Sequence, residues 1–118
     1  MNFVETNNRS FSTGTNVIPR FARVVMGTNN VILQAGTNAC IGTMREDSFG
    51  VAGEVHTLHL ISKAGTIPMI ATSSNITGGG YVYGAASGKV DSTGTIIEGI
   101  SLVNAPAAGD IIEVVPRN

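Results

Sequence analysis

The apolar positions of the chain form short runs that glycine, asparagine and proline interrupt. The runs occupy residues 17–18, 21–26, 31–35, 39–43, 54–61, 67–71, 81–83, 89–90, 94–103 and 111–115. Most are rich in β-branched residues and close to the length of an ordinary strand, about five or six residues. Apolar residues at i, i+3 and i+4 are not sustained over a helix length of about ten residues. The pattern predicts an all-β fold, a small antiparallel β-barrel or sandwich.

The N-terminal residues 1–16 break this pattern. They are rich in Asn, Thr and Ser, with a few isolated apolar positions. We interpret them as an irregular N-terminal arm that precedes a β-domain over residues 17–118. Docking one Phe of such an arm on another surface contributes about 1.5–3 kcal/mol. The arm is therefore predicted to be an interface element, with these contact residues: Phe3, Val4, Arg9 and Phe11.

Residues 78–80 form a triple glycine directly before Tyr81-Val82-Tyr83. A phosphate-binding loop needs a helix after its glycines, because the amides at the helix N-terminus meet the anion. Tyr and Val favour a strand instead, and no Gly-Lys-Ser/Thr motif follows. Gly79 and Gly80 are therefore interpreted as hinge residues of a turn.

Two further turns are predicted in the second half of the chain. Gly88 follows Ser87 and can supply the positive φ of a hairpin turn. Gly109 precedes Asp110, whose side chain can bond its own backbone. In the run 67–71, Pro68 indicates a strand at a sheet edge or a bend.

Composition narrows the choice of partner. Hydrophobic residues make up 42% of the 118 residues, charged residues only 13%, and the formal net charge is -1. This balance lacks the basic surface that nucleic-acid binders use to neutralise phosphates. The N-terminus lacks the features of a signal peptide, and apolar runs fall short of the roughly 20 residues that cross a bilayer. A weakly charged surface is poorly protected against association, so a protein partner is expected rather than nucleic acid or a membrane.

Candidate chemical groups are few. Cys40 is the only cysteine and lies in an apolar stretch, which indicates a small buried hydrophobe rather than a nucleophile. His56 and His59 are three positions apart in the longest run, so in one strand they would face opposite sides and not share a metal. Both are expected to be half-exposed. The sequence indicates no catalytic residue, no metal, no cofactor and no small-molecule substrate, so an enzyme is not expected.

The second half carries an ordered set of motifs. They are Gly79-Gly80-Tyr81-Val82-Tyr83, Gly88-Lys89-Val90, Ile97-Glu98-Gly99-Ile100-Ser101-Leu102 and Ala107-Ala108-Gly109-Asp110-Ile111-Ile112-Glu113-Val114. This order resembles the small capsid decoration (cement) proteins of tailed bacteriophages, a group often classed as a domain of unknown function. The likeness covers about residues 17–115 and is specific over 78–115. Ser101 departs from it, since the family often has alanine there.

The resemblance implies a fold and a function. Alternating core contacts are expected from six apolar positions: Val82, Val90, Ile97, Leu102, Ile112 and Val114. The implied function is a decoration protein, made in the host cytoplasm, that binds the outer surface of the assembled head in the virion. Its partner is the major capsid protein, whose subunits it bridges. A homotrimer is also implied, and the high apolar fraction favours it because excess apolar surface is buried between copies. A monomer stays open because some decoration proteins bind singly, and a dimer stays open because it is the commonest closed oligomer.

One function of a different class stays open. A fibre-like or lectin-like adhesin, acting as a receptor-binding module, is the alternative. A decoration protein co-purifies with mature heads at a fixed stoichiometry, whereas an adhesin binds cells or glycans by itself.

Overall fold

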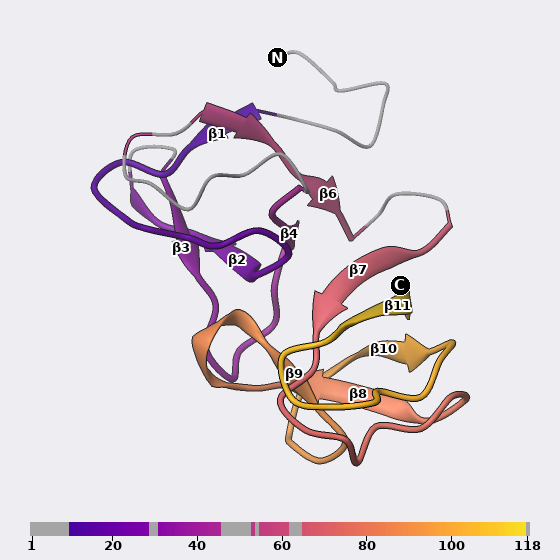
Figure 1. Ribbon diagram of the computed structural model, residues 1–118. Helices are drawn as coiled ribbons and strands as arrows, with labels where there is room; N and C mark the ends of the chain where they lie inside the picture. Colours follow the sequence, from indigo (N-terminus) through magenta and orange to yellow (C-terminus); the bar gives the residue numbers. More distant parts are fainter. Residues whose placement is uncertain (1–9, 29–30, 46–52, 54, 62–64, 118) are drawn as a thin grey trace.

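The structure is a computed structural model that describes residues 10–28, 31–45, 53, 55–61 and 65–117. These ranges contain short β-strands, no α-helix, and helical turns of the short 3-10 kind only (Figure 1). Strands stay short because each β-branched run ends within a few residues at a glycine or a polar turn residue. The prediction of an all-β fold is confirmed.

The strands form two main antiparallel sheets and a two-stranded ribbon. The ribbon pairs β1 (Ser10–Ser12) with β5 (Val55–Thr57). The N-terminal sheet has the order β3 (Ile32–Gln34), β2 (Arg23–Met26), β4 (Gly42–Thr43) and β6 (His59–Leu60). The C-terminal sheet has the order β7 (Ile67–Ile70), β11 (Ile111–Pro116), β10 (Ile97–Ser101), β8 (Tyr81–Gly84) and β9 (Val90–Asp91), and the 3-10 turn η2 (Ala86–Gly88) joins β8 to β9.

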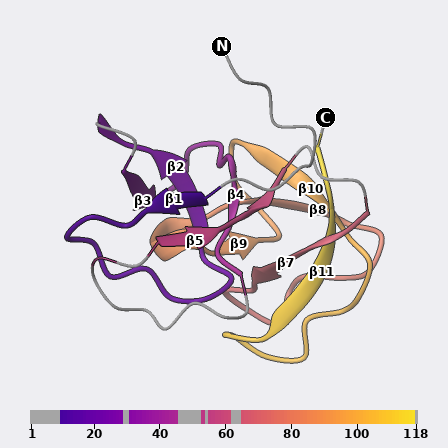
Figure 2. The same cartoon turned by 90° about the horizontal axis from the view of Figure 1, so that it is seen from above.

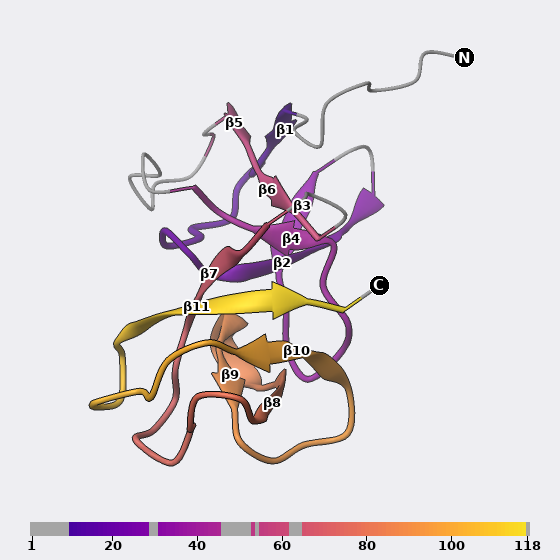
Figure 3. The same cartoon turned by 90° about the vertical axis from the view of Figure 1, so that its right-hand side faces the viewer.

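The C-terminal sheet curls into a half-barrel (Figure 3). Directly after β7, Ala71 forms a parallel bridge with Val90 of β9, and Thr72 N donates to Val90 O at 2.9 Å. These contacts bring the two edge strands of the sheet together. Pro68 lies in the edge strand β7 and confirms the prediction for that run, because proline has no N–H to donate in a central strand.

Two hydrophobic cores support the two sheets. The half-barrel encloses one core, which includes Met69, Val82 and Ile112, and the N-terminal sheet covers the other, which includes Val24 and Leu58. Seen from above, β2 and β3 lie on one side and β7 and β11 on the other (Figure 2). Side chains cross between the halves: Val25 and Ile61 pack on the half-barrel core, and Ile70 packs on the N-terminal core.

The run 54–61 is not one strand, in contrast to the prediction. It divides at Leu58 into β5 of the ribbon and β6 of the N-terminal sheet. Leu58 is fully buried in the N-terminal core, so the bend gains apolar burial that a straight strand would lack. The division also separates His56, on β5, from His59, on β6. His59 is only 9% exposed, so the expectation of a half-exposed side chain is wrong for this residue.

Strand β10 has its apolar residues on the outside. Val82, Val90, Ile112 and Val114 are buried as predicted, but Ile97 is 41% and Leu102 52% exposed. The register shifts between Ile97 and Gly99, because a β-bulge inserts one residue into β10. The bulge turns Glu98 inward, and Glu98 and Ser101 are fully buried. The prediction that Ile97 and Leu102 are core residues is therefore wrong.

The predicted glycine turns are present. Gly79 and Gly109 have φ of 85° and 87°, and Ser87 and Gly88 follow each other at 61° and 72°. Positive φ at both positions is the geometry of a tight hairpin turn, which η2 provides between β8 and β9. Gly80 N donates to Thr77 O at 3.0 Å, which closes the turn before β8.

At the turn around Gly109, the backbone of Asp110 forms the hydrogen bonds. Asp110 N donates to Ala107 O at 3.3 Å, and Ala71 N donates to Asp110 O at 2.9 Å. These bonds close the Gly109 turn and attach it to the residue that follows β7. The predicted turn is therefore stabilised by main-chain pairing rather than by the predicted side-chain bond.

The described part of the N-terminal segment belongs to the fold. Ser10–Ser12 forms β1, and Phe11 is buried in the N-terminal core together with Ile18 and Met44. Ser12 also bridges Val31, next to β3. The prediction of an irregular arm over residues 1–16 is therefore wrong for residues 10–12, where burial of Phe11 and pairing with β5 favour a strand.

Candidate interaction face

The outward side of β8, β10 and β11 is apolar. Tyr81, Ile97, Ile100, Leu102 and Val115 are all exposed, with exposed fractions between 38% and 56%. We call these five residues the outer face. Large apolar side chains scattered singly over a surface are ordinary, but a cluster of them on one side of a sheet marks a site of macromolecular contact.

Cross-strand pairing makes the outer face continuous. Ile100 pairs with Val115 of β11 on one side and with Tyr81 of β8 on the other. Leu102 extends the line of β10, and its N–H donates to Glu113 O at 2.9 Å. Opposite side chains on adjacent strands have Cβ atoms about 4.5–5.5 Å apart, so Tyr81, Ile100 and Val115 form one row across three strands.

The outer face carries almost no charge. Within the described residues of β8, β10 and β11, Glu113 is the one charged side chain on the exposed side, and Glu98 is buried. The Glu113 carboxylate accepts a hydrogen bond from Thr66 Oγ1 at 3.4 Å. A partner that covered this face would be held by apolar burial and shape rather than by charge complementarity.

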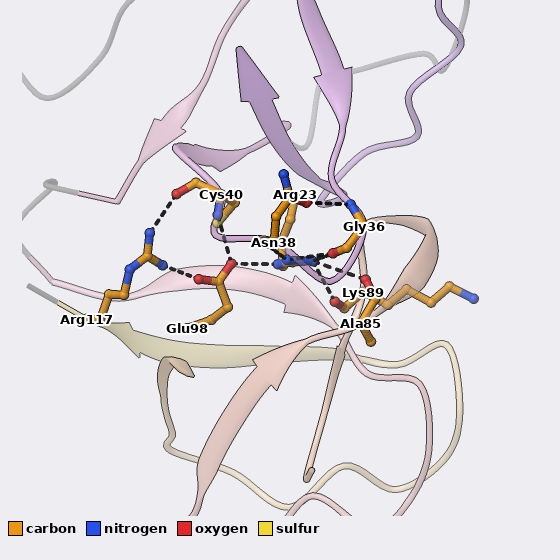
Figure 4. Close-up of polar contacts among 8 residues, drawn as sticks. All are labelled: Arg23, Gly36, Asn38, Cys40, Ala85, Lys89, Glu98 and Arg117. Carbon is orange, nitrogen blue, oxygen red and sulfur yellow. Dashed lines mark hydrogen bonds and ion pairs between the residues drawn. The ribbon is translucent and has the colours of Figure 1, made fainter. Parts of the chain in front are cut away.

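A buried ion pair lies behind this face. Arg23 of β2 and Glu98 of β10 both have fully buried side chains, and Arg23 Nε donates to Glu98 Oε2 at 2.7 Å (Figure 4). The same guanidinium donates to four backbone carbonyls, those of Gly36, Asn38, Ala85 and Lys89. A charge is tolerated in a protein interior when it is paired and hydrogen-bonded, and Arg23 meets both conditions. Arg23 thus joins the N-terminal sheet to η2 and β10.

Glu98 also holds the residue that follows β11. Its Oε1 accepts from Arg117 Nη1, and Arg117 Nη2 donates to Cys40 O at 2.8 Å (Figure 4). Cys40 N donates to Glu98 Oε2 at 3.2 Å. Both carboxylate oxygens are therefore engaged on the inner side of β10. Because Glu98 directly follows Ile97 at the bulge, these bonds keep Ile97 turned outward.

The thiol of Cys40 is unreactive in this position. Its side chain is buried in the half-barrel core, which confirms the prediction of a small buried hydrophobe. Burial, and after it the negative charge of Glu98, raises the pKa of the Cys40 thiol to about 12. The thiolate is the reactive form of cysteine, and at neutral pH Cys40 stays protonated.

The predicted interface residues fall into two groups. Phe3, Val4 and Arg9 lie outside the described residues, so their role stays a prediction. Phe11 is buried in the core of the domain and does not offer a free surface to a partner. Of the predicted turn residues, Gly79, Gly80, Gly88 and Gly109 take part in turns that shape the ends of β8, β9 and β11.

The sequence prediction missed both the outer face and the ion pair behind it. One signal was available: Ile97 and Ile100 are three positions apart, so both can face the same side of one strand only if a bulge intervenes. Arg23 gave a second signal, as a charged residue within the apolar run 21–26. Its partner was not foreseeable, because Glu98 is 75 residues away in sequence.

Comparisons with known proteins add no family. Neither a scan against protein-family models nor a search of curated proteins gave a match to this chain. Across the described ranges, no helix is long and apolar enough to span a membrane. The same ranges contain no group of three or more His, Cys, Asp or Glu side chains placed to hold a metal ion.

Proposed function

We propose that this chain is a non-enzymatic capsid decoration protein of a tailed bacteriophage. It binds the outer surface of the assembled head and bridges subunits of the major capsid protein. The observation that carries the proposal is the outer face, an exposed apolar surface on a sheet, which is typical of a protein that acts within an assembly. The motif order of residues 78–115 supports it, because those motifs supply the strands and turns on which the outer face is built.

Stabilisation of the head follows from mass action. A protein that binds the assembled lattice and not free subunits adds its binding free energy to the assembled state. Contacts repeated over a lattice supply avidity without one tight site. A weakly charged protein with exposed apolar residues suits this role, since its contacts depend little on ionic strength.

The test compares heads of the phage that encodes this chain with heads from which its gene has been deleted. We expect added density on the outer surface of complete heads in cryo-electron microscopy, and a higher temperature of DNA release for complete heads than for deleted ones. Adding the purified protein back to deleted heads should restore both properties. Unchanged density and unchanged heat resistance would overturn the proposal, and binding of the isolated protein to cells or glycans would favour the adhesin.

A further inference from the structure

We propose that the outer face pairs with the outer face of a second copy of this chain, in a two-fold symmetric dimer. Two sheets that pack face to face lie about 10 Å apart with their strands roughly aligned. The surface on β8, β10 and β11 has what such packing needs: one apolar residue column on the central strand, an apolar flank on each side, and almost no charge.

The size of the outer face matches the requirement of a stable dimer. Its five side chains expose between 38% and 56% of their surface. Taking the roughly 200 Å² of an aromatic side chain as the upper value for each residue, this amounts to at most about 450 Å² of apolar area. A standard interface takes about 800 Å² from each partner, of which slightly more than half is apolar. One outer face therefore supplies most of the apolar share of one side of an interface.

The arrangement of residues is self-complementary. A two-fold axis that runs along β10, between the two sheets, places Ile100 opposite Ile100 of the second copy. The same rotation brings β8 over β11, so the large Tyr81 lies opposite the small Val115 in both halves of the pair. Alternation of large and small residues across facing positions is how packed layers interdigitate. An isologous contact uses the same patch on both partners, as this one does.

The single charge of the face does not oppose this pairing. Glu113 lies on β11, level with Leu102 of β10. Under the same rotation it faces the position on the second copy that precedes β8, where the chain has Gly79 and Gly80 and no side chain to bury the carboxylate. Glu113 therefore stays at the solvated rim of the contact, where charges are tolerated.

The dimer can act as the unit that bridges capsid subunits. This bridging role rests on the proposed function, whereas the pairing of the two copies does not. In Figure 3, β11 lies between β10 and the N-terminal sheet, with β8 on the far side. Placing β11 over β8 of the second copy therefore sets the two N-terminal halves at opposite ends of the dimer. Two such ends can contact two neighbouring subunits of a shell.

The test introduces a charge at residue 100, which lies on the proposed two-fold axis. The purified chain should show the mass of two chains in sedimentation-equilibrium experiments at micromolar concentration. Ile100→Lys and Ile100→Glu should each weaken dimerisation by roughly 100-fold or more, because like charges then meet at the axis. An equimolar mixture of the two variants should form a heterodimer. Leu33→Lys is the matched control, because Leu33 is also exposed but lies on β3, outside the face.

Each outcome decides the proposal. Urea unfolding of both Ile100 variants should match the parent protein, which shows that dissociation is not unfolding. A parent mass of one chain, or of the three chains expected from the sequence resemblance, would overturn the two-fold pairing. So would dissociation by Leu33→Lys, or a mixture that fails to pair. A monomer that still binds heads overturns the dimer alone, whereas a dimer that does not bind heads overturns the proposed function alone.

Discussion

The substitution Glu98→Gln is expected to be among the most destabilising isosteric changes in this chain. It removes the negative charge that compensates Arg23 but keeps the size of the side chain. Arg23 is fully buried and cannot move its charge to water. The new amide can accept from Arg23 only by turning its NH2 group toward Arg117, which is itself a donor. Either Arg117 or Arg23 therefore loses its acceptor, and in both orientations the buried charge of Arg23 is no longer compensated.

The expected cost follows from these contacts. Removing one partner of a buried ion pair costs about 3–5 kcal/mol, because an uncompensated charge remains inside. Arg117 contributes little to this sum, since its side chain is 28% exposed and water can replace the lost bond. A domain of this kind has roughly 5–15 kcal/mol of total stability, so the substitution removes a large fraction of it.

Urea unfolding followed by circular dichroism measures this effect. The free energy of unfolding should fall by about 3–5 kcal/mol with an unchanged slope against urea. Glu113→Gln is the control, because Glu113 is exposed on β11, and it should change the free energy by no more than about 0.5 kcal/mol. A loss below about 1 kcal/mol for Glu98→Gln would refute the reasoning that Arg23 depends on this carboxylate.

Three further predictions concern the thiol, one turn and the N-terminal segment. Because the pKa of Cys40 is about 12 in the folded protein and 9.0 for an unperturbed thiol, the folded state keeps its proton to higher pH than the unfolded state does. Stability relative to Cys40→Ala should therefore fall as pH rises from about 9 to about 12, and equal pH profiles in urea unfolding would contradict this. Gly88→Ala places a Cβ at a φ of 72° and 2.9 Å from the Cβ of Ala22, whereas Gly79→Ala places one at a φ of 85° with nothing within 4 Å. The free energy of unfolding should therefore fall by at least about 1 kcal/mol more for Gly88→Ala than for Gly79→Ala, and equal losses would show that the contact with Ala22 is relieved. Deleting residues 2–9 keeps β1 and Phe11 and should weaken binding to heads, and undiminished head binding would remove the interface role of Phe3, Val4 and Arg9. Deleting residues 2–16 also removes β1 and Phe11, so it should destabilise the fold by about 3–5 kcal/mol more than the shorter deletion.

The sequence by itself determined the local structure of this protein. The two-residue period of a strand placed Val82 of β8 and Ile112 of β11 on the side opposite to their neighbours, because that period is a property of neighbouring positions. Gly88 and Gly109 predicted their turns, because positive φ is a local demand that glycine meets at low cost. The burial of Cys40 followed from its apolar neighbours.

Only the tertiary structure decided which elements meet and which sides face water. The run 54–61 reads as one strand, but burial of Leu58 divides it between the ribbon and the N-terminal sheet. The sequence predicts that Ile97 and Leu102, in and next to strand β10, are core residues. A bulge and the pairing of Glu98 with Arg23 turn the apolar residues of β10 outward instead. Both outcomes depend on partners far away in the chain, and no local pattern encodes the free energy of contacts that form only when the chain is folded.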